Sequence, residues 1–245
     1  MPTYRLDISY DGAAFSGWAI QPGERTVQAE LEAALSQVLN QPTRLTVAGR
    51  TDAGVHAIGQ VASFSSEPGM KPALLLRALN GLTGRDVAVN AVAEAPDGFS
   101  ARRDATARRY RYRIETASVP SPFEDKRALR WPYPFDPALA ERCGEVLRGV
   151  HDFTAFTPTD TRHRHFNRTI LDAGWTRETD TLFSFEIEAD AFLRGMVRAI
   201  VGTILEVAGG KRDLADFERL LTGAARAEAG DSASPYGLYL LRVVY

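Results

Sequence analysis

One carboxylate stands between two glycines in the stretch AGRTDAGVHA, residues 48–57, with an arginine two residues before it. Glycine tolerates backbone angles that other residues avoid, so Gly49 and Gly54 predict the corners of a tight loop that projects Asp52 from a sheet edge. A nearby cation keeps a carboxylate ionised near neutral pH, as nucleophilic or electrostatic catalysis requires. A surface turn that uses Asp and Gly for their turn chemistry accounts for the same residues.

A second candidate is Arg198, which lies in an apolar segment, residues 192–207, whose other charges are Arg194 and Glu206. A helix that is apolar nearly all round is expected to be buried. A buried guanidinium needs an anion with good geometry. Two interpretations follow: a salt bridge that holds two halves of the protein together, or an arginine that orients and ionises a catalytic carboxylate such as Asp52.

Composition excludes several classes of protein. The chain has 245 residues, a net charge of −2 and a single cysteine, Cys143, so it forms no internal disulfide and no cysteine-based zinc site. No apolar run approaches the ~20 residues that span a bilayer, and we expect a cytoplasmic protein. His163 and His165 are spaced like metal ligands, but no carboxylate or cysteine cluster accompanies them, so we expect no metal.

The positive charges are clustered although the net charge is small. One cluster comprises Arg102, Arg103, Arg108, Arg109, Arg111 and Arg113, and another comprises Arg162, His163, Arg164, His165 and Arg168. Acidic residues gather elsewhere along the chain, which predicts one positive face able to bind the phosphates of a nucleic acid. A solvated basic strand is the alternative interpretation.

The elements predict an α+β protein whose two halves, residues 1–103 and 104–245, share one plan. The first half predicts strands at 4–10, 43–49, 56–65 and 87–92, with helices after Thr26 and over 72–82. The second predicts strands at 106–116, 168–177, 181–189 and 238–244, with helices from Asp136 to about 148, over 191–208 and over 213–221. Each half is then a split βαβ of the ferredoxin-like, RRM-like kind, and antiparallel sheets joined into one platform would surround a central cleft.

Five segments, in order, resemble the tRNA pseudouridine synthase A (TruA) family. They are residues 10–21 with Tyr10-Asp11-Gly12, the Asp52 loop, residues 99–112 with Phe99-Ser100-Ala101-Arg102, residues 192–202 with Met196-Val197-Arg198, and Gly237-Leu238-Tyr239-Leu240. The opening segment departs from the family at Ala19-Ile20, where polar or basic residues are frequent, which puts one RNA contact in doubt.

The resemblance implies an isomerase that converts uridine to pseudouridine at positions 38, 39 and 40 of the tRNA anticodon stem-loop, acting as a homodimer without cofactor. It implies that Asp52 is the nucleophile or base, that Tyr110 and Arg198 complete the catalytic set, and that Leu238 packs on the uracil. It further implies that Arg50 enters the space left by the flipped nucleotide. The arginine clusters add Arg102, Arg108 and Arg109 as tRNA-binding candidates.

Two other functions fit parts of the sequence. A non-catalytic RNA-binding module with the same fold would have paired sheets and basic faces but no need of Asp52. A metal-dependent nuclease would gather several carboxylates around its ions, and the sequence offers no such cluster near Asp52.

Overall fold

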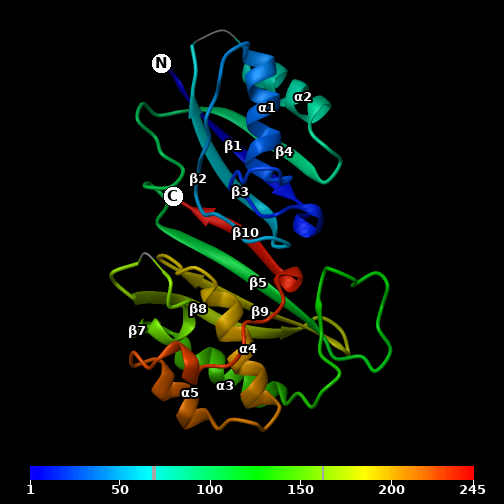
Figure 1. The fold of residues 1–245 in the computed structure, drawn as a ribbon, viewed down its shortest axis with the longest axis vertical. Helices are drawn as coiled ribbons and strands as arrows, with labels where there is room; N and C mark the ends of the chain where they lie inside the picture. The colour runs from blue at the N-terminus through cyan, green and yellow to red at the C-terminus, as the bar shows by residue number, and fades with distance from the viewer. Residues whose placement is uncertain (68–69, 162) are drawn as a thin grey trace. The chain divides into compact units, whose positions relative to one another are not determined.

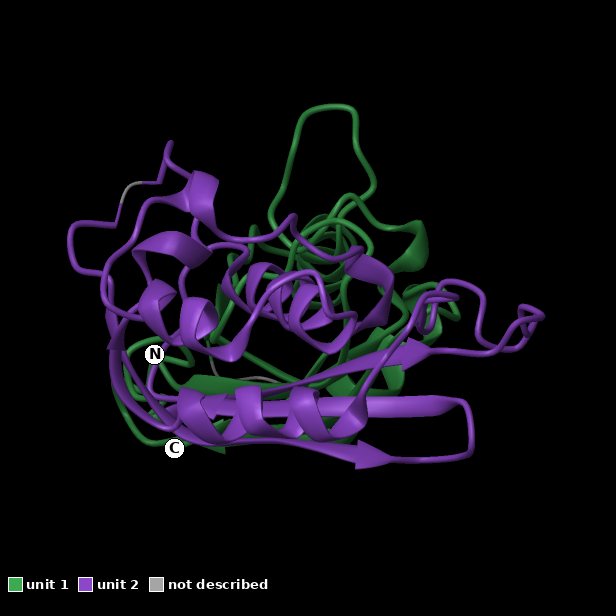
Figure 2. Ribbon diagram, turned by 90° about the horizontal axis from the view of Figure 1, so that it is seen from below, with its two compact units in different colours: residues 1–106, 239–245 green, residues 107–238 purple. Residues whose placement is uncertain are grey.

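The computed structural model describes residues 1–67, 70–161 and 163–245. The chain forms two compact units: unit 1 comprises residues 1–106 and 239–245, and unit 2 comprises residues 107–238 (Figure 2). The boundary expected after residue 103 stays a prediction. Arg162 of the second basic cluster lies outside the described residues.

Unit 1 is a sheet with two helices. Its elements are β1 (Thr3–Tyr10), η1 (Gly12–Ala14), α1 (Val27–Leu39), β2 (Thr46–Val47), β3 (His56–Ser65), α2 (Pro72–Leu82), β4 (Val87–Ala95) and β10 (Leu238–Val244), the last joining unit 1 from residue 239 (Figure 1). The strand order is β4-β1-β3-β10, and β2 also pairs with β3. β1 is antiparallel to both neighbours, whereas β10 is parallel to β3 with Tyr239 opposite His56.

The helices of unit 1 begin where the sequence predicts. The Thr26 side chain accepts a hydrogen bond from the amide of Ala29 and caps α1, while Pro72 occupies the first turn of α2. Leu31 and Leu35, in the apolar stripe of α1, are fully buried.

The described part of unit 2 contains five strands and three α-helices. Its elements are β5 (Ala107–Glu115), β6 (Leu129–Arg130), α3 (Pro137–Leu147), β7 (Gly149–Asp152), η2 (Thr154–Phe156), β8 (Asn167–Arg177), β9 (Leu182–Ala189), α4 (Met196–Ala208), α5 (Leu214–Leu220), η3 (Arg226–Glu228) and η4 (Pro235–Gly237). The strand order is β5-β9-β8-β7, all antiparallel, and β6 runs parallel to β5. α3 packs on β8, and the three helices pack on one another.

The structure differs from the predicted elements in unit 2 at the start of one helix and at the short strands β6 and β7, neither of which was predicted. The helix expected over 191–208 begins at Met196, because Gly195 adopts the left-handed conformation with φ of 68° and stops the helical turn. The short strand β7 was not predicted from the sequence. Its four residues are too few to show the alternation that identifies a strand.

The arginines of β5 lie among carboxylates, which corrects the prediction that acidic residues gather elsewhere. Arg109 pairs with Asp172, Glu186 and Glu188, Arg111 pairs with Glu186, and Arg113 pairs with Glu124 and Glu178, at 2.6–3.4 Å. The sequence could not show this because the partners lie on β8, β9 and neighbouring loops. The positive charge of this face of β5 is largely compensated within unit 2.

None of the described helices has the length and hydropathy needed to cross a bilayer.

The start of α3 gives a stability prediction. The Asp136 carboxylate accepts hydrogen bonds from the amides of Ala138 and Leu139, so Asp136→Ala should lower the free energy of unfolding by about 1 kcal/mol. Asp136→Asn keeps the acceptor and should unfold within about 0.5 kcal/mol of the wild type. Urea titration of both variants measures the difference, and equal losses in the two would contradict the capping role.

Candidate active site

The Asp52 loop joins β2 to β3 in unit 1 with its carboxylate exposed. Gly54 has a φ of 78°, and the amide of Val55 donates to the carbonyl of Asp52 at 3.2 Å, which closes a tight turn. Arg50 and Asp52 are exposed, whereas Thr51 between them is 7% exposed. The loop thus presents a charged side chain on each side of one buried residue.

A buried hydrogen-bonded chain holds this loop from beneath. The hydroxyl groups of Thr51 and Tyr10 lie 2.8 Å apart, and the Gln60 amide donates to the Tyr10 oxygen at 3.3 Å and to the Gly49 carbonyl at 2.7 Å. Desolvation by burial raises the pKa of Tyr10 to about 12, although its hydrogen bonds with Thr51 and Gln60 oppose the shift. The phenol is therefore neutral at ordinary pH and serves as a fixed support.

The opening segment brackets the loop through its backbone. The amide of Trp18 donates to the Thr51 carbonyl at 3.0 Å, and the amide of Gly54 donates to the Phe15 carbonyl at 3.2 Å. A Cβ at Gly12 would lie 2.0 Å from the Val55 carbonyl oxygen, so only glycine permits this approach. Residues 12–18 and the Asp52 loop therefore form one rigid assembly.

His56, at the end of the loop, belongs to the same support. Its ring is 3% exposed and stacks on Tyr239 with 4.6 Å between ring centroids. The Gly12 amide donates to Nδ1 at 3.1 Å, and an Asp11 carboxylate oxygen lies 3.1 Å from the same nitrogen. These contacts fit a structural role that ties β3, β10 and the opening segment together.

Tyr110 lies on β5 of unit 2 and is 8% exposed. Its ring meets Phe192 edge to face, with centroids 4.9 Å apart and an angle of 81° between the planes. Phe192 precedes α4, and the same turn is held by Arg108, whose Nη1 donates to the Asp190 carbonyl at 3.1 Å. The orientation of Tyr110 is thus coupled to the segment that leads into α4.

Arg198 lies on α4, and its side chain is half-buried. Its Nε donates to the Ala233 carbonyl at 2.7 Å, and the Ala233 amide donates to the Arg198 carbonyl at 3.0 Å. Burial raises the pKa of Tyr112 well above its usual range, and the positive charge of Arg198 opposes that shift. The Nε bond fixes the plane of the guanidinium, a constraint that the sequence did not reveal.

Leu238 begins β10 and is 6% exposed. It follows Gly237, where a Cβ would lie 2.7 Å from the Arg113 carbonyl oxygen and 2.9 Å from the Tyr112 ring. The Tyr112 hydroxyl donates to the Ser234 carbonyl at 2.7 Å. The absence of a side chain at Gly237 therefore lets the chain cross β5 closely and sets where Leu238 lies.

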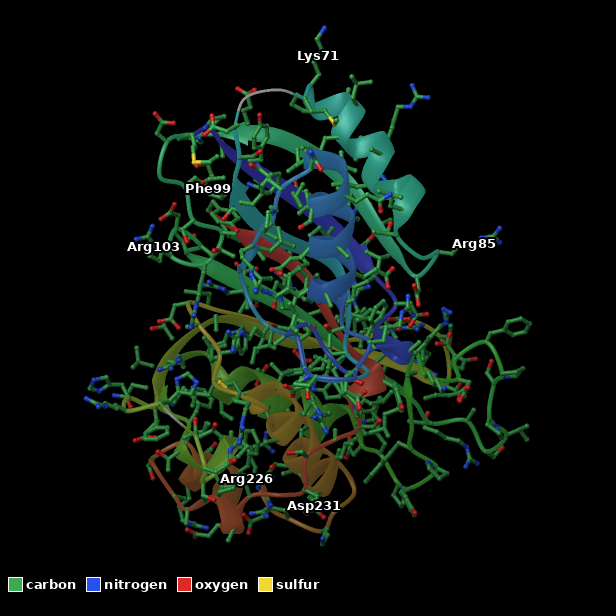
Figure 3. The ribbon with its side chains drawn as sticks, turned by 45° about the horizontal axis from the view of Figure 1, so that its top comes forward. Lys71, Arg85, Phe99, Arg103, Arg226 and Asp231 are labelled. Atoms are coloured by element: carbon green, nitrogen blue, oxygen red, sulfur yellow. The ribbon has the colours of Figure 1, made fainter. Side chains whose placement is uncertain are left out.

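The tRNA-binding candidates occupy three different settings. Arg102 is exposed in a turn that is closed by the Ser100 amide, which donates to the Asp104 carboxylate at 2.8 Å. Its neighbour Arg103 projects away from the ribbon, as do Lys71 and Arg85 (Figure 3). Arg108 is half-buried on β5, and Arg109 lies in the ion-pair network described above.

The candidate residues are divided between the two units. Unit 1 holds Arg50, Asp52 and Arg102, and unit 2 holds Arg108, Arg109, Tyr110, Arg198 and Leu238. Within unit 2, residues 233–237 connect the Arg198 contact to Leu238. The pairing of Asp52 with Arg198 involves both units and stays a prediction. Gln60 was not among the residues predicted for the site. The feature that could have identified it is its polar side chain in the otherwise apolar strand around Val61.

Among residues 1–67, 70–161 and 163–245, no three His, Cys, Asp or Glu side chains gather as a metal site requires.

The sequence is similar to a family of known proteins. The family model described as tRNA pseudouridine synthase matches residues 8–102 and 145–245. The chain is 41% identical to tRNA pseudouridine synthase A of Geobacillus sp. (strain WCH70) over 242 residues, which cover 98% of this chain and 97% of that protein. It is 42% identical to the protein of the same name from Frankia casuarinae, covering 98% and 88%. The match to the Listeria monocytogenes serotype 4a protein is 37% and covers both chains fully.

The buried phenol beneath the Asp52 loop gives a pH prediction. Tyr10 holds its proton up to a pKa of about 12 in the folded protein but loses it near 10 when unfolded. The buried phenol therefore contributes to the free energy of unfolding below pH 10, and this contribution of about 2–3 kcal/mol is lost as the pH rises toward 12. In Tyr10→Phe the free energy of unfolding should lack this part of its decrease with pH.

Urea unfolding of the wild type and of Tyr10→Phe at several values between pH 9.5 and 11.5 measures the two slopes. Other groups titrate equally in both proteins, so the difference in slope reports on Tyr10. Parallel slopes would contradict the assigned role of burial.

Proposed function

This chain belongs to the tRNA pseudouridine synthase family, and on that premise we propose that it modifies positions 38, 39 and 40 of the anticodon stem-loop. Family membership makes it an isomerase that converts uridine in tRNA to pseudouridine. The observation that carries the site assignment is the exposed Asp52 on a loop locked by Tyr10, Thr51 and Gln60. A reactive carboxylate needs this combination of access and fixed geometry.

The proposed reaction balances without any co-reactant. The N1–C1′ glycosidic bond breaks, the uracil turns, and C5 joins C1′. The proton on C5 leaves and N1 ends protonated, so substrate and product are isomers. Asp52 either attacks C1′ directly or removes the C2′ proton to give a glycal, and both routes use the same carboxylate.

The other residues are assigned by the resemblance. Arg198 holds Asp52 ionised, Tyr110 and Leu238 enclose the uracil, and Arg50 fills the space left by the flipped nucleotide. Flipping a paired base costs a few kcal/mol, which phosphate contacts offset. The edge-to-face contact of Tyr110 with Phe192 supports this assignment because a packed ring can serve as a stacking surface.

Phosphate binding is proposed for Arg102, Arg108 and Arg109. Arg102 is exposed, which supports its assignment. Arg109 has three carboxylate partners, so it would have to exchange one of them for a phosphate and should contribute least. The homodimer, the cytoplasmic location and the platform of two ferredoxin-like halves around a cleft complete the proposal as predictions.

A non-catalytic RNA-binding module is the rival function. Such a module has no use for an exposed carboxylate, because Asp52 would repel the phosphates that it binds. The support built beneath Asp52 favours the enzyme for this reason.

The central variant is Asp52→Asn, which keeps the size of the side chain and removes its charge. We expect pseudouridine formation at positions 38–40 to fall by at least about 10³-fold while tRNA affinity stays within about threefold, since the carboxylate acts on the reacting bonds. Carbodiimide labelling of the product, read by primer extension, locates the pseudouridines.

Asp97→Asn is the matched control, because Asp97 is also exposed and also lies in a glycine-containing turn, where Gly98 follows it directly. It should modify tRNA at the wild-type rate. Normal turnover by Asp52→Asn would remove the catalytic assignment, and modification at other positions would remove the proposed positional selection.

The two faces of β5 give a binding prediction. Arg108→Gln should weaken tRNA binding and reduce the slope of log K against log salt by about 0.7–0.9, as the loss of one phosphate contact requires. Arg111→Gln, on the same strand but paired with Glu186 at 2.7 Å, should leave the slope unchanged. Filter binding over a range of salt concentrations measures both, and equal slopes for the two variants would refute the distinction.

A further inference from the structure

Residues 222–237 of unit 2, here called the strap, follow α5 and lead into β10. Apart from the single-turn η3 and η4 the strap has no regular structure, yet hydrogen bonds or ion pairs hold it to the rest of unit 2 at its start, middle and end. It follows α4 from the end of that helix back to Arg198 and then leads into Leu238.

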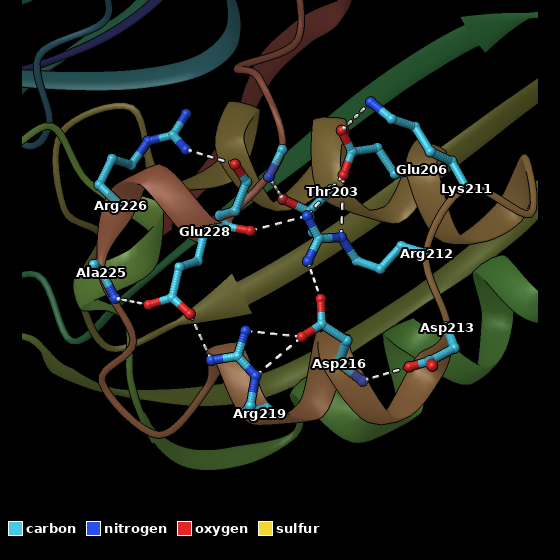
Figure 4. Close-up of polar contacts among 12 residues, drawn as sticks. Thr203, Glu206, Lys211, Arg212, Asp213, Asp216, Arg219, Ala225, Arg226 and Glu228 are labelled. Carbon is cyan, nitrogen blue, oxygen red and sulfur yellow. Dashed lines mark hydrogen bonds and ion pairs between the residues drawn. The ribbon is translucent and has the colours of Figure 1, made fainter.

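Glu228 of η3, inside the strap, is held by a network of ion pairs and hydrogen bonds near the end of α4 (Figure 4). Arg212 pairs with Glu206 of α4 at 2.9 Å and with Asp216 of α5, and also donates to the Glu228 carbonyl at 2.9 Å. Arg219 pairs with Glu228 at 2.7 Å. Arg219 and Glu228 are about half exposed, and we expect exposed pairs of this kind to contribute little individually.

The middle of the strap touches α4 directly. The Thr203 hydroxyl is fully buried, donates to the Ala199 carbonyl at 2.8 Å and accepts from the Gly230 amide at 3.0 Å. One residue earlier, a Cβ at Gly202 would lie 1.8 Å from the Asp231 carbonyl oxygen. Backbone contact at Gly202 and the buried hydroxyl of Thr203 together fix the register of the strap along the helix.

The last part of the strap holds the two candidate site residues. Ala233 exchanges hydrogen bonds with Arg198 through its carbonyl and its amide, and Ser234 accepts from the Tyr112 hydroxyl at 2.7 Å. Gly237 then crosses Tyr112 immediately before Leu238. A shift of the strap along α4 would therefore move the acceptor of the Arg198 Nε and the start of β10 together.

From these contacts we infer that the strap is a positioning device for the isomerisation, and that Thr203 and Tyr112 are positioning residues that act through Arg198. This inference rests on the proposed function, because it requires Arg198 to act on the uridine reaction. Thr203 sets the register of the strap on α4 and Tyr112 fixes it to β5. Between them, the Ala233 carbonyl holds the guanidinium plane at the angle that the reaction needs.

The test removes one hydroxyl at a time and measures binding and turnover separately. Thr203→Val is isosteric and loses the acceptor for Gly230. Its single-turnover rate on tRNA should fall about tenfold while tRNA affinity stays within about twofold, because a small misplacement slows chemistry more than binding. Thr203→Ser keeps the hydroxyl and should restore the rate. Tyr112→Phe, which deletes only an oxygen, should reproduce the slow rate.

Thr222→Val is the matched control, since the Thr222 hydroxyl donates to the Arg219 carbonyl at the far end of the strap. This variant should react at the wild-type rate. A wild-type rate for both Thr203→Val and Tyr112→Phe would overturn the inference, and so would an equal loss in Thr222→Val.

A double-mutant cycle separates positioning from general loosening of the fold. Lysine lacks the planar Nε–H donor of arginine, so Arg198→Lys uncouples this side chain from Ala233. In the Arg198→Lys background, Thr203→Val should slow the reaction by less than about twofold, because the hydrogen bond between the Arg198 Nε and Ala233, through which Thr203 acts, is already absent. The same tenfold loss in both backgrounds would overturn the inference while leaving the proposed function intact.

The proposed function fails in a different way. If the wild type formed no pseudouridine in tRNA, the function itself would fall. If Arg198→Lys reacted at the wild-type rate, the role of Arg198, and the strap with it, would fall although the isomerase would remain.

Discussion

Close approach of one backbone segment to another is the constraint on which the candidate residues of each unit depend. A Cβ would lie 2.0 Å from a carbonyl oxygen at Gly12, 1.8 Å at Gly202 and 2.7 Å at Gly237. These distances admit no other residue without movement of the main chain. The first contact supports the Asp52 loop in unit 1, and the other two position the strap beside Arg198 and Leu238 in unit 2. The geometry of the candidate residues is thus set by main-chain packing more than by their own side chains.

Both units support a candidate residue with a buried threonine hydroxyl. Each buries a threonine hydroxyl on an element that carries a residue assigned to the chemistry: Thr51 precedes Asp52 in its loop, and Thr203 lies five residues after Arg198 on α4. Each hydroxyl has partners with defined geometry, because an unpaired polar group in the interior is costly. Fixed support beneath an accessible charged group is what electrostatic catalysis requires, since the group then need not reorganise as charge develops.

The sequence predicted the features that local patterns determine. The cap of α1 at Thr26, the start of α3 at Asp136 and the extent of β10 follow from capping chemistry and alternation, and all are confirmed. The sequence did not predict the carboxylate partners of Arg109 or the parallel pairing of β10 with β3, because both depend on contacts between distant segments. The Ala233 acceptor for Arg198 lies in an irregular segment without periodicity, so no pattern could identify it. The family resemblance supplied the roles of Tyr110 and Leu238, which local patterns alone describe as strand core.

The most direct measurement is tritium release from tRNA labelled at C5 of uridine, because loss of that proton accompanies the new C5–C1′ bond. The account predicts rapid release by the wild type, the same rate with a chelator present, and no release above background by Asp52→Ala, which should still bind tRNA. Absence of release by the wild type despite tight tRNA binding, or full release by Asp52→Ala, would contradict it.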